Sequence, residues 1–314
     1  MGKTAFVFPG QGSQTPGMGK AIAEADDQAN ALFEEADRKL GYSLSSIIFD
    51  GPQEELTKTT NAQPALLTTG IALLKALEKA GVKADYTAGH SLGEYTALVA
   101  SGSIPFSDAV YAVHKRGEFM EEAVPDGEGT MAAVLGLDRN FLQKATDEVT
   151  AAGDPVQLAN LNCPGQIVIS GTVAGVEKAG EKAKGLGAKR VIPLQVSGPF
   201  HSSLMKPAAE KFRSVLNEVD IKDAEIPLIA NVTAEPVTSS RDIGEKLIEQ
   251  LYSPVLWEDT VEKLIELGVD TFIEIGPGKV LSGLIKKVNR GVRTLSVQDP
   301  DTLAAALEAL KEEA

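Results

Sequence analysis

Short apolar runs alternate with helical patterns in the first part of this chain. Residues 4–8 form an apolar run that ends at Pro9-Gly10, which predicts a buried strand leading into a loop. Three further elements are expected: a helix over residues 64–80 that ends at Gly81, a strand over 85–89 and a helix over 92–100. Strand, helix, strand, helix in that order predicts a parallel α/β sheet.

The pattern changes in the middle of the chain, where two predicted strands follow each other directly. Six elements are expected in the order strand, helix, strand, strand, helix, strand: residues 130–137, 140–150, 156–161, 166–170, 173–186 and 190–195. This is the order of a ferredoxin-like subdomain. We therefore predict an α/β fold with two parts. Residues 1–127 and 198–314 form a large α/β-hydrolase-like domain with a parallel sheet, and residues 128–197 form a small ferredoxin-like insertion.

Helices and strands alternate again after the insertion. The expected elements are a helix over 203–217, a strand over 227–232, a helix over 243–252, strands over 271–275 and 293–297, and a last helix capped by Asp299 or Asp301.

The residues Gly89-His90-Ser91-Leu92-Gly93 fit the pattern G-x-S-x-G between a predicted strand and a predicted helix. Such a sharp turn brings backbone segments too close for side chains, and it holds the serine in a strained conformation. The turn exposes the hydroxyl of Ser91, and the N–H of Leu92 at the helix N-terminus is free to bind an oxyanion. We predict a nucleophilic serine. The alternative is a glycine-rich turn that only packs a helix against the sheet.

A serine hydroxyl needs a base, and the chain has three histidines. His90 adjoins Ser91 and is expected to support the turn. His114 lies within a predicted helix and is expected to be a packed or surface side chain. His201 lies in a loop between a strand and a helix, where catalytic groups are often displayed, so we predict that it is the base. No acidic residue is an evident partner for it, and a backbone carbonyl can orient the ring instead.

The glycine-rich loop Pro9-Gly10-Gln11-Gly12-Ser13-Gln14 follows the first predicted strand. It is not a phosphate loop, because Thr15 and Met18 stand where the dinucleotide-binding and Walker patterns require other residues. Instead, the N–H of Gln11 is a candidate for a second oxyanion donor.

Composition narrows the classes of protein. The chain has 43% apolar and 24% charged residues, as ordinary globular proteins do. Its net charge of -14 argues against nucleic-acid binding. It shows neither a secretory signal nor an apolar stretch of membrane-spanning length, so we expect a cytoplasmic protein. The single cysteine, Cys163, excludes an internal disulfide and a multi-cysteine metal site, and we expect it to be a packing residue.

One basic cluster stands out near the end of the acidic chain, at Lys286, Lys287, Arg290 and Arg293. It is either a solvated helix end or a docking patch for an acidic partner.

The loop that contains Gln11, the segment Gly89-His90-Ser91-Leu92-Gly93-Glu94-Tyr95 and the Phe200-His201 loop together resemble the malonyl-CoA:acyl carrier protein transacylases of bacterial fatty acid synthesis. The resemblance covers essentially the whole chain. It extends over three further segments: residues 160–171, 231–233 and 274–278.

The resemblance implies a role for each site residue. Ser91 becomes malonylated and His201 activates it, while the N–H groups of Gln11 and Leu92 form the oxyanion hole. The main-chain carbonyl of Gln250 orients His201. Arg116 holds the free carboxylate of the malonyl group, since a guanidinium fork pairs two hydrogen bonds with a carboxylate. Further substrate contacts are expected from three residues: Phe200, His90 and Asn160.

The resemblance also implies the reaction and its partners. Malonyl-CoA loads the serine, and the phosphopantetheine thiol of acyl carrier protein then accepts the malonyl group, without a metal or cofactor. The carrier protein is acidic, so Lys286 and Lys287, with Lys189 and Arg190, are candidate docking residues. We expect a monomer. The alternatives are a serine esterase or thioesterase, an acyltransferase of a polyketide pathway, and a non-catalytic module that binds carrier protein.

Overall fold

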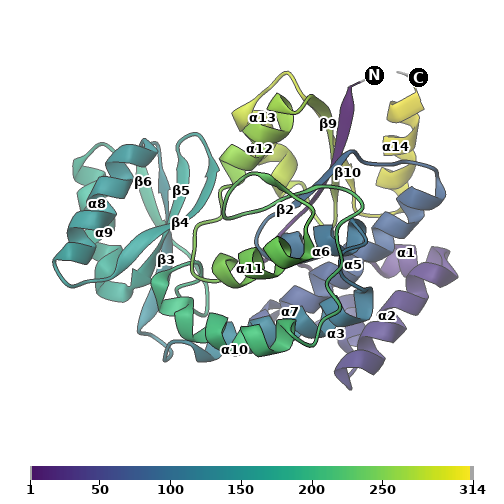
Figure 1. Ribbon diagram of the computed structural model, residues 1–314, viewed down its shortest axis with the longest axis horizontal. Coiled ribbons are helices and arrows are strands. Elements are labelled where there is room, and N and C mark those ends of the chain that lie inside the picture. Colours follow the sequence, from purple (N-terminus) through teal and green to yellow (C-terminus); the bar gives the residue numbers. More distant parts are fainter. Residues whose placement is uncertain (1, 312–314) are drawn as a thin grey trace.

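The computed structural model describes residues 2–311 and contains two sheets (Figure 1). The larger sheet has six strands in the order β10-β9-β1-β2-β7-β8. All neighbours in it are parallel except β7 and β8, which are antiparallel. Its strands are β1 (Lys3–Phe8), β2 (Tyr86–Gly89), β7 (Leu228–Ile229), β8 (Pro236–Val237), β9 (Val269–Ile275) and β10 (Arg293–Val297). The predicted parallel sheet is confirmed.

Helices cover both faces of the large sheet, which explains why its central strands are apolar throughout. Along β1, Phe6 and Phe8 join one apolar cluster, while Ala5 and Val7 point to the opposite face and join another. The helices of this part are α1 (Lys20–Ala25), α2 (Asp27–Leu40), α3 (Leu44–Asp50), α4 (Gln53–Thr57), α5 (Thr59–Lys79), α6 (Leu92–Ala100), α7 (Phe106–Glu122), α10 (Lys206–Leu216), α11 (Ser240–Gln250), α12 (Trp257–Glu266), α13 (Val280–Val288) and α14 (Pro300–Lys311). A short 3-10 turn, Ser203–Met205, precedes α10.

The second sheet has four antiparallel strands in the order β4-β5-β3-β6, and it lies to one side of the large sheet (Figure 1). Its elements are β3 (Gly129–Leu135), α8 (Arg139–Ala151), β4 (Val156–Cys163), β5 (Gln166–Thr172), α9 (Val173–Gly185) and β6 (Arg190–Pro193). These elements share an apolar cluster of their own, built around residues such as Ile169 and Leu142. The predicted order of elements is confirmed.

Several predicted boundaries were wrong. The helix expected from Pro64 begins at Thr59. Pro64 has no N–H to donate to the carbonyl of Thr60, and Nδ1 of His114 takes that place at 3.0 Å, so the helix tolerates the proline. The strand expected over residues 227–232 is only the two-residue β7, because the chain turns at Asn231. Asp299, not Asp301, caps the last helix, since its side chain accepts from the N–H of Thr302.

Candidate active site

Ser91 lies at the sharp turn between β2 and α6, as the pattern predicts. Its φ of 51° and ψ of -106° are strained for a residue with a side chain. A Cβ on Gly93 would lie 2.1 Å from the carbonyl oxygen of Phe8, and one on Gly89 would lie 1.9 Å from Gly93. Glycines are therefore required where α6 crosses the ends of β1 and β2. The hydroxyl of Ser91 is held at the carboxyl ends of these central strands.

Asn231 fixes the strained turn from the neighbouring strand end. Its Oδ1 accepts from the N–H of Ser91 at 2.8 Å, and its Nδ2 donates to the carbonyl of Gly89 at 2.6 Å. The side chain is fully buried, so these two bonds are shielded from water. Asn231 belongs to a segment of the family resemblance, but nothing in its local sequence predicts this contact across the sheet.

His201 reaches Ser91 from the loop before α10. Its Nε2 lies 2.7 Å from Oγ of Ser91, and its Nδ1 lies 2.7 Å from the carbonyl oxygen of Gln250. A carbonyl only accepts, so Nδ1 carries the proton and Nε2 is left to accept from the serine. Burial lowers the pKa of His201 to about 3, and the charge of Arg116 adds to this effect. The ring is therefore neutral at physiological pH.

Arg116 lies on α7 with only 1% of its surface exposed. Its guanidinium donates to the side-chain oxygens of Gln63 at 2.7 Å and Gln250 at 2.8 Å, and to Oγ of Ser91 at 3.1 Å. The ring of Tyr95 lies 5.4 Å from it. Among the described residues no carboxylate oxygen lies within 4.0 Å of the guanidinium. A buried cation without an ionic partner is well suited to bind an anion beside Ser91.

A cavity of about 220 Å³ opens onto these groups. It lies between the two sheets, since Met131 comes from β3 and Asn160 from β4, whereas Ser91 follows β2. Of the residues predicted for the site, eight line it: Ser91, His201, Gln11, Leu92, Arg116, Phe200, His90 and Asn160. Gln250 lies behind the wall, fully buried, and contacts the site through hydrogen bonds.

Gln11 and Leu92 meet the conditions for oxyanion donors. Both line the cavity, and neither backbone N–H has an acceptor among the described residues. The loop of Gln11 is pressed against the turn, since a Cβ on Gly10 would lie 2.5 Å from the carbonyl oxygen of His90. His90 itself packs rather than points to Ser91, because its Nε2 lies 2.8 Å from Oδ1 of Asn162 and its ring lies against Trp257.

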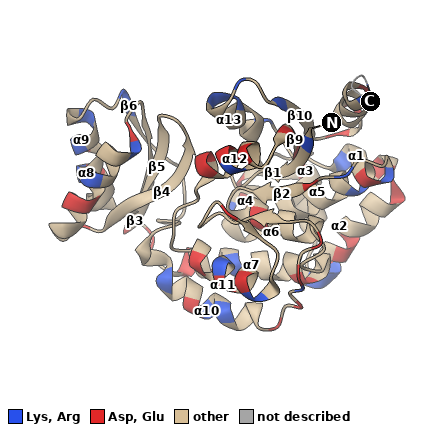
Figure 2. Cartoon of the chain, turned by 45° about the horizontal axis from the view of Figure 1, so that its top comes forward, with Lys and Arg blue, Asp and Glu red and all other residues tan. Residues whose placement is uncertain are grey.

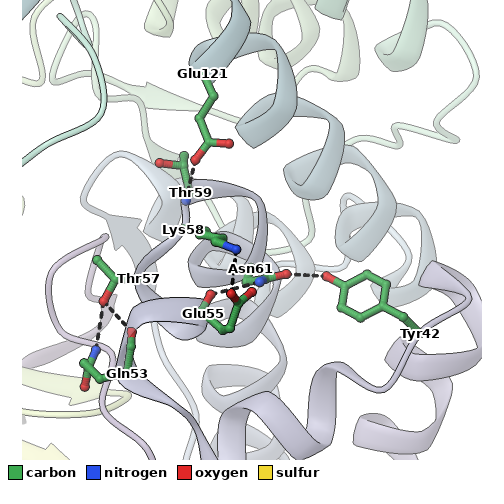
Figure 3. Close-up of polar contacts among 8 residues, drawn as sticks. All are labelled: Tyr42, Gln53, Glu55, Thr57, Lys58, Thr59, Asn61 and Glu121. Carbon is green, nitrogen blue, oxygen red and sulfur yellow. Dashed lines mark hydrogen bonds and ion pairs between the residues drawn. The ribbon is translucent and has the colours of Figure 1, made fainter. Parts of the chain in front are cut away.

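Polar contacts tie the start of α5 to neighbouring segments (Figure 3). The N–H of Thr59 donates to Glu121 of α7 at 2.8 Å, and Asn61 accepts from the hydroxyl of Tyr42 at 2.8 Å. The hydroxyl of Thr59 also accepts from the side chain of Gln11 at 3.2 Å. Helix α5, which carries Gln63, is thus tied both to the helix of Arg116 and to the glycine-rich loop.

The predicted docking residues lie elsewhere. Lys286 and Lys287 lie on the last turn of α13 and line a separate open cleft of about 560 Å³ with Pro164 and Arg290. Cys163 is fully buried in an apolar cluster, as expected of a packing residue. In the part of the chain that the structure describes, no group of three His, Cys, Asp or Glu side chains is arranged to hold a metal ion. None of the described helices combines the length and the hydropathy of a membrane span.

The fold and the site are those of an acyl transferase, and the match to a family model agrees with this class. Residues 5–306 match the acyl transferase domain family. The chain is 64% identical over 313 residues to the malonyl CoA-acyl carrier protein transacylase of Bacillus subtilis, covering 100% of this chain and 99% of the relative. The chain belongs to the malonyl CoA-acyl carrier protein transacylase family.

Solved structures show the same similarity. A malonyl CoA-acyl carrier protein transacylase from Clostridium perfringens has a TM-score of 0.96 and 44% identity, covering 99% of this chain and 98% of that one. A malonyl-transacylase solved in complex with a type II PKS acyl-carrier protein has a TM-score of 0.94 and 44% identity, covering 98% and 99%.

Proposed function

We propose that this protein transfers the malonyl group from malonyl-CoA to the phosphopantetheine thiol of acyl carrier protein, through a malonyl ester of Ser91, and so supplies fatty acid synthesis. The observation that carries the proposal is one juxtaposition. The hydroxyl of Ser91 lies 2.7 Å from a neutral imidazole and 3.1 Å from a buried guanidinium that has no ionic partner in the described part of the chain. A nucleophile, its base and a carboxylate-binding group thus share one cavity.

The first half-reaction loads the enzyme. Oγ of Ser91 attacks the thioester carbonyl carbon while Nε2 of His201 takes its proton. The N–H groups of Gln11 and Leu92 stabilise the oxyanion. When the tetrahedral intermediate collapses, the C–S bond breaks and the proton on His201 passes to the departing CoA thiolate. The carbonyl of Gln250 keeps the ring in the required orientation and stabilises its positive charge in between.

The second half-reaction reverses these roles. The thiol of the carrier protein's phosphopantetheine arm gives its proton to His201 and attacks the malonyl ester carbon. The C–O bond then breaks, and His201 returns the proton to Oγ of Ser91. Because each half uses the same oxyanion donors and the same base, one site serves both thiols in turn.

Arg116 supports a dicarboxylic acyl group as the substrate. Its guanidinium lies beside Ser91, where the free carboxylate of a malonyl group bound to Oγ is close at hand. An acetyl group leaves the buried cation unpaired. Phe200, which is 7% exposed and lines the cavity, limits the room for a branched α-carbon, and Asn160 and His90 complete the wall around the substrate.

Acyl carrier protein is proposed to dock on the basic cleft of α13. Lys and Arg gather at this end of α13, whereas Asp and Glu crowd the neighbouring α12 (Figure 2). The ammonium group of Lys287 donates to Oε1 of Gln166 at 3.0 Å, so it lies against the turn between β4 and β5 of the small sheet. Lys189 and Arg190, at the start of β6, are further candidates. Charge reversal at Lys286 and Lys287 should slow transfer to carrier protein at low salt, and unchanged turnover would remove this surface.

Other features are proposed with the function. The element order and the strand order β4-β5-β3-β6 support a ferredoxin-like insertion, and all its strands lie within residues 129–193, which supports the bounds 128–197. The parallel sheet with a serine at a strand-to-helix turn supports a hydrolase-like large domain of residues 1–127 and 198–314. We also propose a cytoplasmic monomer that needs no metal or cofactor.

Intact-mass measurement after mixing with malonyl-CoA and, in parallel, with acetyl-CoA tests the proposal. We expect a malonyl adduct that Ser91→Ala abolishes, that persists in buffer, and that disappears when holo carrier protein is added. Rapid loss without an acceptor favours a thioesterase, and the absence of any adduct favours a non-catalytic module. Transfer rates to fatty acid and polyketide carrier proteins, compared side by side, separate the two pathways.

A further inference from the structure

A buried carboxylate that the proposed reaction does not use, that of Glu94, lies beside the site. Glu94 is in the first turn of α6, and 1% of its surface is exposed. Oε2 accepts from Nε2 of Gln250 at 2.6 Å, and Oε1 accepts from the backbone N–H of Asn231 at 3.2 Å. Among the described residues no lysine or arginine nitrogen lies within 4.0 Å of it. A carboxylate buried without an ionic partner is costly, so a role for it is expected.

The side chain of Gln250 joins this carboxylate to Arg116. Its Oε1 accepts from the guanidinium at 2.8 Å, while its Nε2 donates both to Glu94 and to the carbonyl of Ser91 at 2.9 Å. A carboxamide has one accepting end and one donating end. Only this orientation gives each end a partner of the opposite kind, so Glu94 and Ser91 together fix which end faces Arg116.

The amide separates the two charges without uncoupling them. A carboxylate in direct contact with Arg116 would occupy the N–H groups that a substrate carboxylate needs. With the amide in between, the negative charge of Glu94 still stabilises the guanidinium through a low-dielectric interior. The guanidinium therefore keeps a counter-charge on its buried side and stays available on the side of Ser91.

We propose that Glu94 is a positioning residue for malonyl recognition, which acts through the carboxamide of Gln250 to orient Arg116 while leaving it free for the substrate carboxylate. This inference rests on the proposed function, in which Arg116 binds the substrate carboxylate, and it assigns to Glu94 the orientation and availability of that guanidinium. Burial raises the pKa of Glu94 to about 7, and the hydrogen bonds from Gln250 and Asn231 oppose that rise.

Glutamine cannot replace Glu94 without a conflict. Both neighbours, Nε2 of Gln250 and the N–H of Asn231, are donors. A carboxylate offers each an acceptor, whereas an amide at position 94 sets its own NH₂ against one of them. If that donor is Gln250, its carboxamide is pushed out of the orientation that holds Arg116. The isosteric change Glu94→Gln thus removes the interaction and leaves the volume intact.

The experiment measures kcat/KM for acylation of the full chain by malonyl-CoA and by acetyl-CoA, by rapid quench and intact mass. Five variants are compared: Glu94→Gln, Glu94→Asp, Arg116→Ala, the double variant Arg116→Ala with Glu94→Gln, and Glu274→Gln. Glu274 is the matched control, since it is also a fully buried glutamate that accepts from two N–H groups, those of Leu281 and Ser282, at the start of α13. Glu274 does not line the cavity, so its replacement should affect folding stability but not substrate binding.

We expect Glu94→Gln to lower the malonyl-to-acetyl ratio roughly tenfold or more, and Glu274→Gln to leave the ratio unchanged. In the Arg116→Ala background, Glu94→Gln should no longer change the ratio. Glu94→Asp, whose shorter arm weakens the contact with Gln250, should lower it by a smaller factor, and it serves as the test if Glu94→Gln does not fold.

An equal loss of both acylation rates in the Glu94 variants, or an unchanged ratio in Glu94→Asp and Glu94→Gln, overturns the inference while the proposed function stands. An unchanged ratio in Arg116→Ala instead contradicts the role of Arg116 in the proposed function, and the inference fails with it. The two failures are therefore distinguishable.

Discussion

Replacing Arg116 by alanine tests the basis of substrate choice. In the loaded enzyme the guanidinium is expected to pair with the malonyl carboxylate in a site from which water is largely excluded, as its 1% exposure indicates. Removing one partner of a buried ion pair costs about 3–5 kcal/mol. At 1.36 kcal/mol for each factor of ten, malonyl kcat/KM should fall by roughly one hundredfold to several thousandfold. Acetyl loading has no such pair to lose, so it should persist or increase.

Stability changes less than this, because two effects oppose each other. Arg116→Ala leaves the side-chain oxygens of Gln63 and Gln250 without their donor, at about 1–3 kcal/mol each, but it also removes a desolvated charge. Thermal unfolding measures the net effect. Arg116→Lys keeps the charge without the planar fork and should show an intermediate loss of malonyl loading.

Lys115→Ala is the control for the change in charge and helix composition. Lys115 is the preceding residue of α7, and its ammonium group pairs with Glu118 at 2.6 Å away from the cavity. The assay is single-turnover acylation with each thioester, followed by intact mass. If Arg116→Ala and Lys115→Ala both keep the wild-type preference for the malonyl thioester over the acetyl thioester, Arg116 is not the carboxylate-binding residue.

The protonation of His201, the protonation of Glu94 and the close packing at Gly93 can each be tested. Burial first, and the charge of Arg116 second, lower the pKa of His201 to about 3, so the rate of single-turnover acylation should not fall near pH 6.5. Removing that charge in Arg116→Ala should raise the pKa of His201 and move the acid limb of the pH–rate profile to higher pH. A midpoint near 6.5 in the wild-type protein would contradict this. Burial raises the pKa of Glu94 to about 7, so the folded state binds this proton more tightly than the unfolded state does. The free energy of unfolding should therefore decline by up to about 3 kcal/mol as the pH rises from the usual glutamate range through 7. Chemical denaturation across that range should show a smaller decline in Glu94→Gln, and an identical slope counts against the assignment. Gly93→Ala places a Cβ 2.1 Å from the carbonyl oxygen of Phe8 and should prevent folding or acylation. In the control Gly283→Ala on α13, the new Cβ meets none of the described atoms within 4 Å, so thermal unfolding should show a neutral change or a stabilisation of up to about 1 kcal/mol. A stable, active Gly93→Ala would refute the close-packing argument.

Local signals in the sequence were enough to predict the turn that carries Ser91 and the histidine that faces it. The predicted strand, the glycine-flanked serine and the predicted helix all lie within residues 85–100, so the pattern specifies its own geometry. His201 followed by elimination, since only three histidines were available. The bounds of α6, Leu92–Ala100, agree with the predicted helix because the glycine turn before it and its apolar sequence are both local features.

Contacts between distant segments were not predictable in this way. Arg116, flanked by Lys115 and Gly117, reads as an ordinary helix arginine, and only the family resemblance singled it out. The backbone carbonyl of Gln250 has no sequence signature, because every residue carries a backbone carbonyl. Gln63 and the side chain of Asn231 reach the site across 53 and 140 residues, and no periodicity encodes such a pairing.

Among the described residues a carbonyl oxygen, and not an acidic side chain, faces Nδ1 of His201, and the presence of Arg116 gives a physical reason for this. A carboxylate in the place of the Gln250 carbonyl would raise the pKa of the imidazole and would also attract the guanidinium, which shares the side chain of Gln250. Arg116 would then be paired before the substrate arrived, and the malonyl carboxylate would have to displace that partner. A neutral carbonyl orients the ring equally well and leaves the cation unpaired. An enzyme that selects its acyl group by a buried arginine beside the nucleophile is therefore expected to orient its base with an uncharged group.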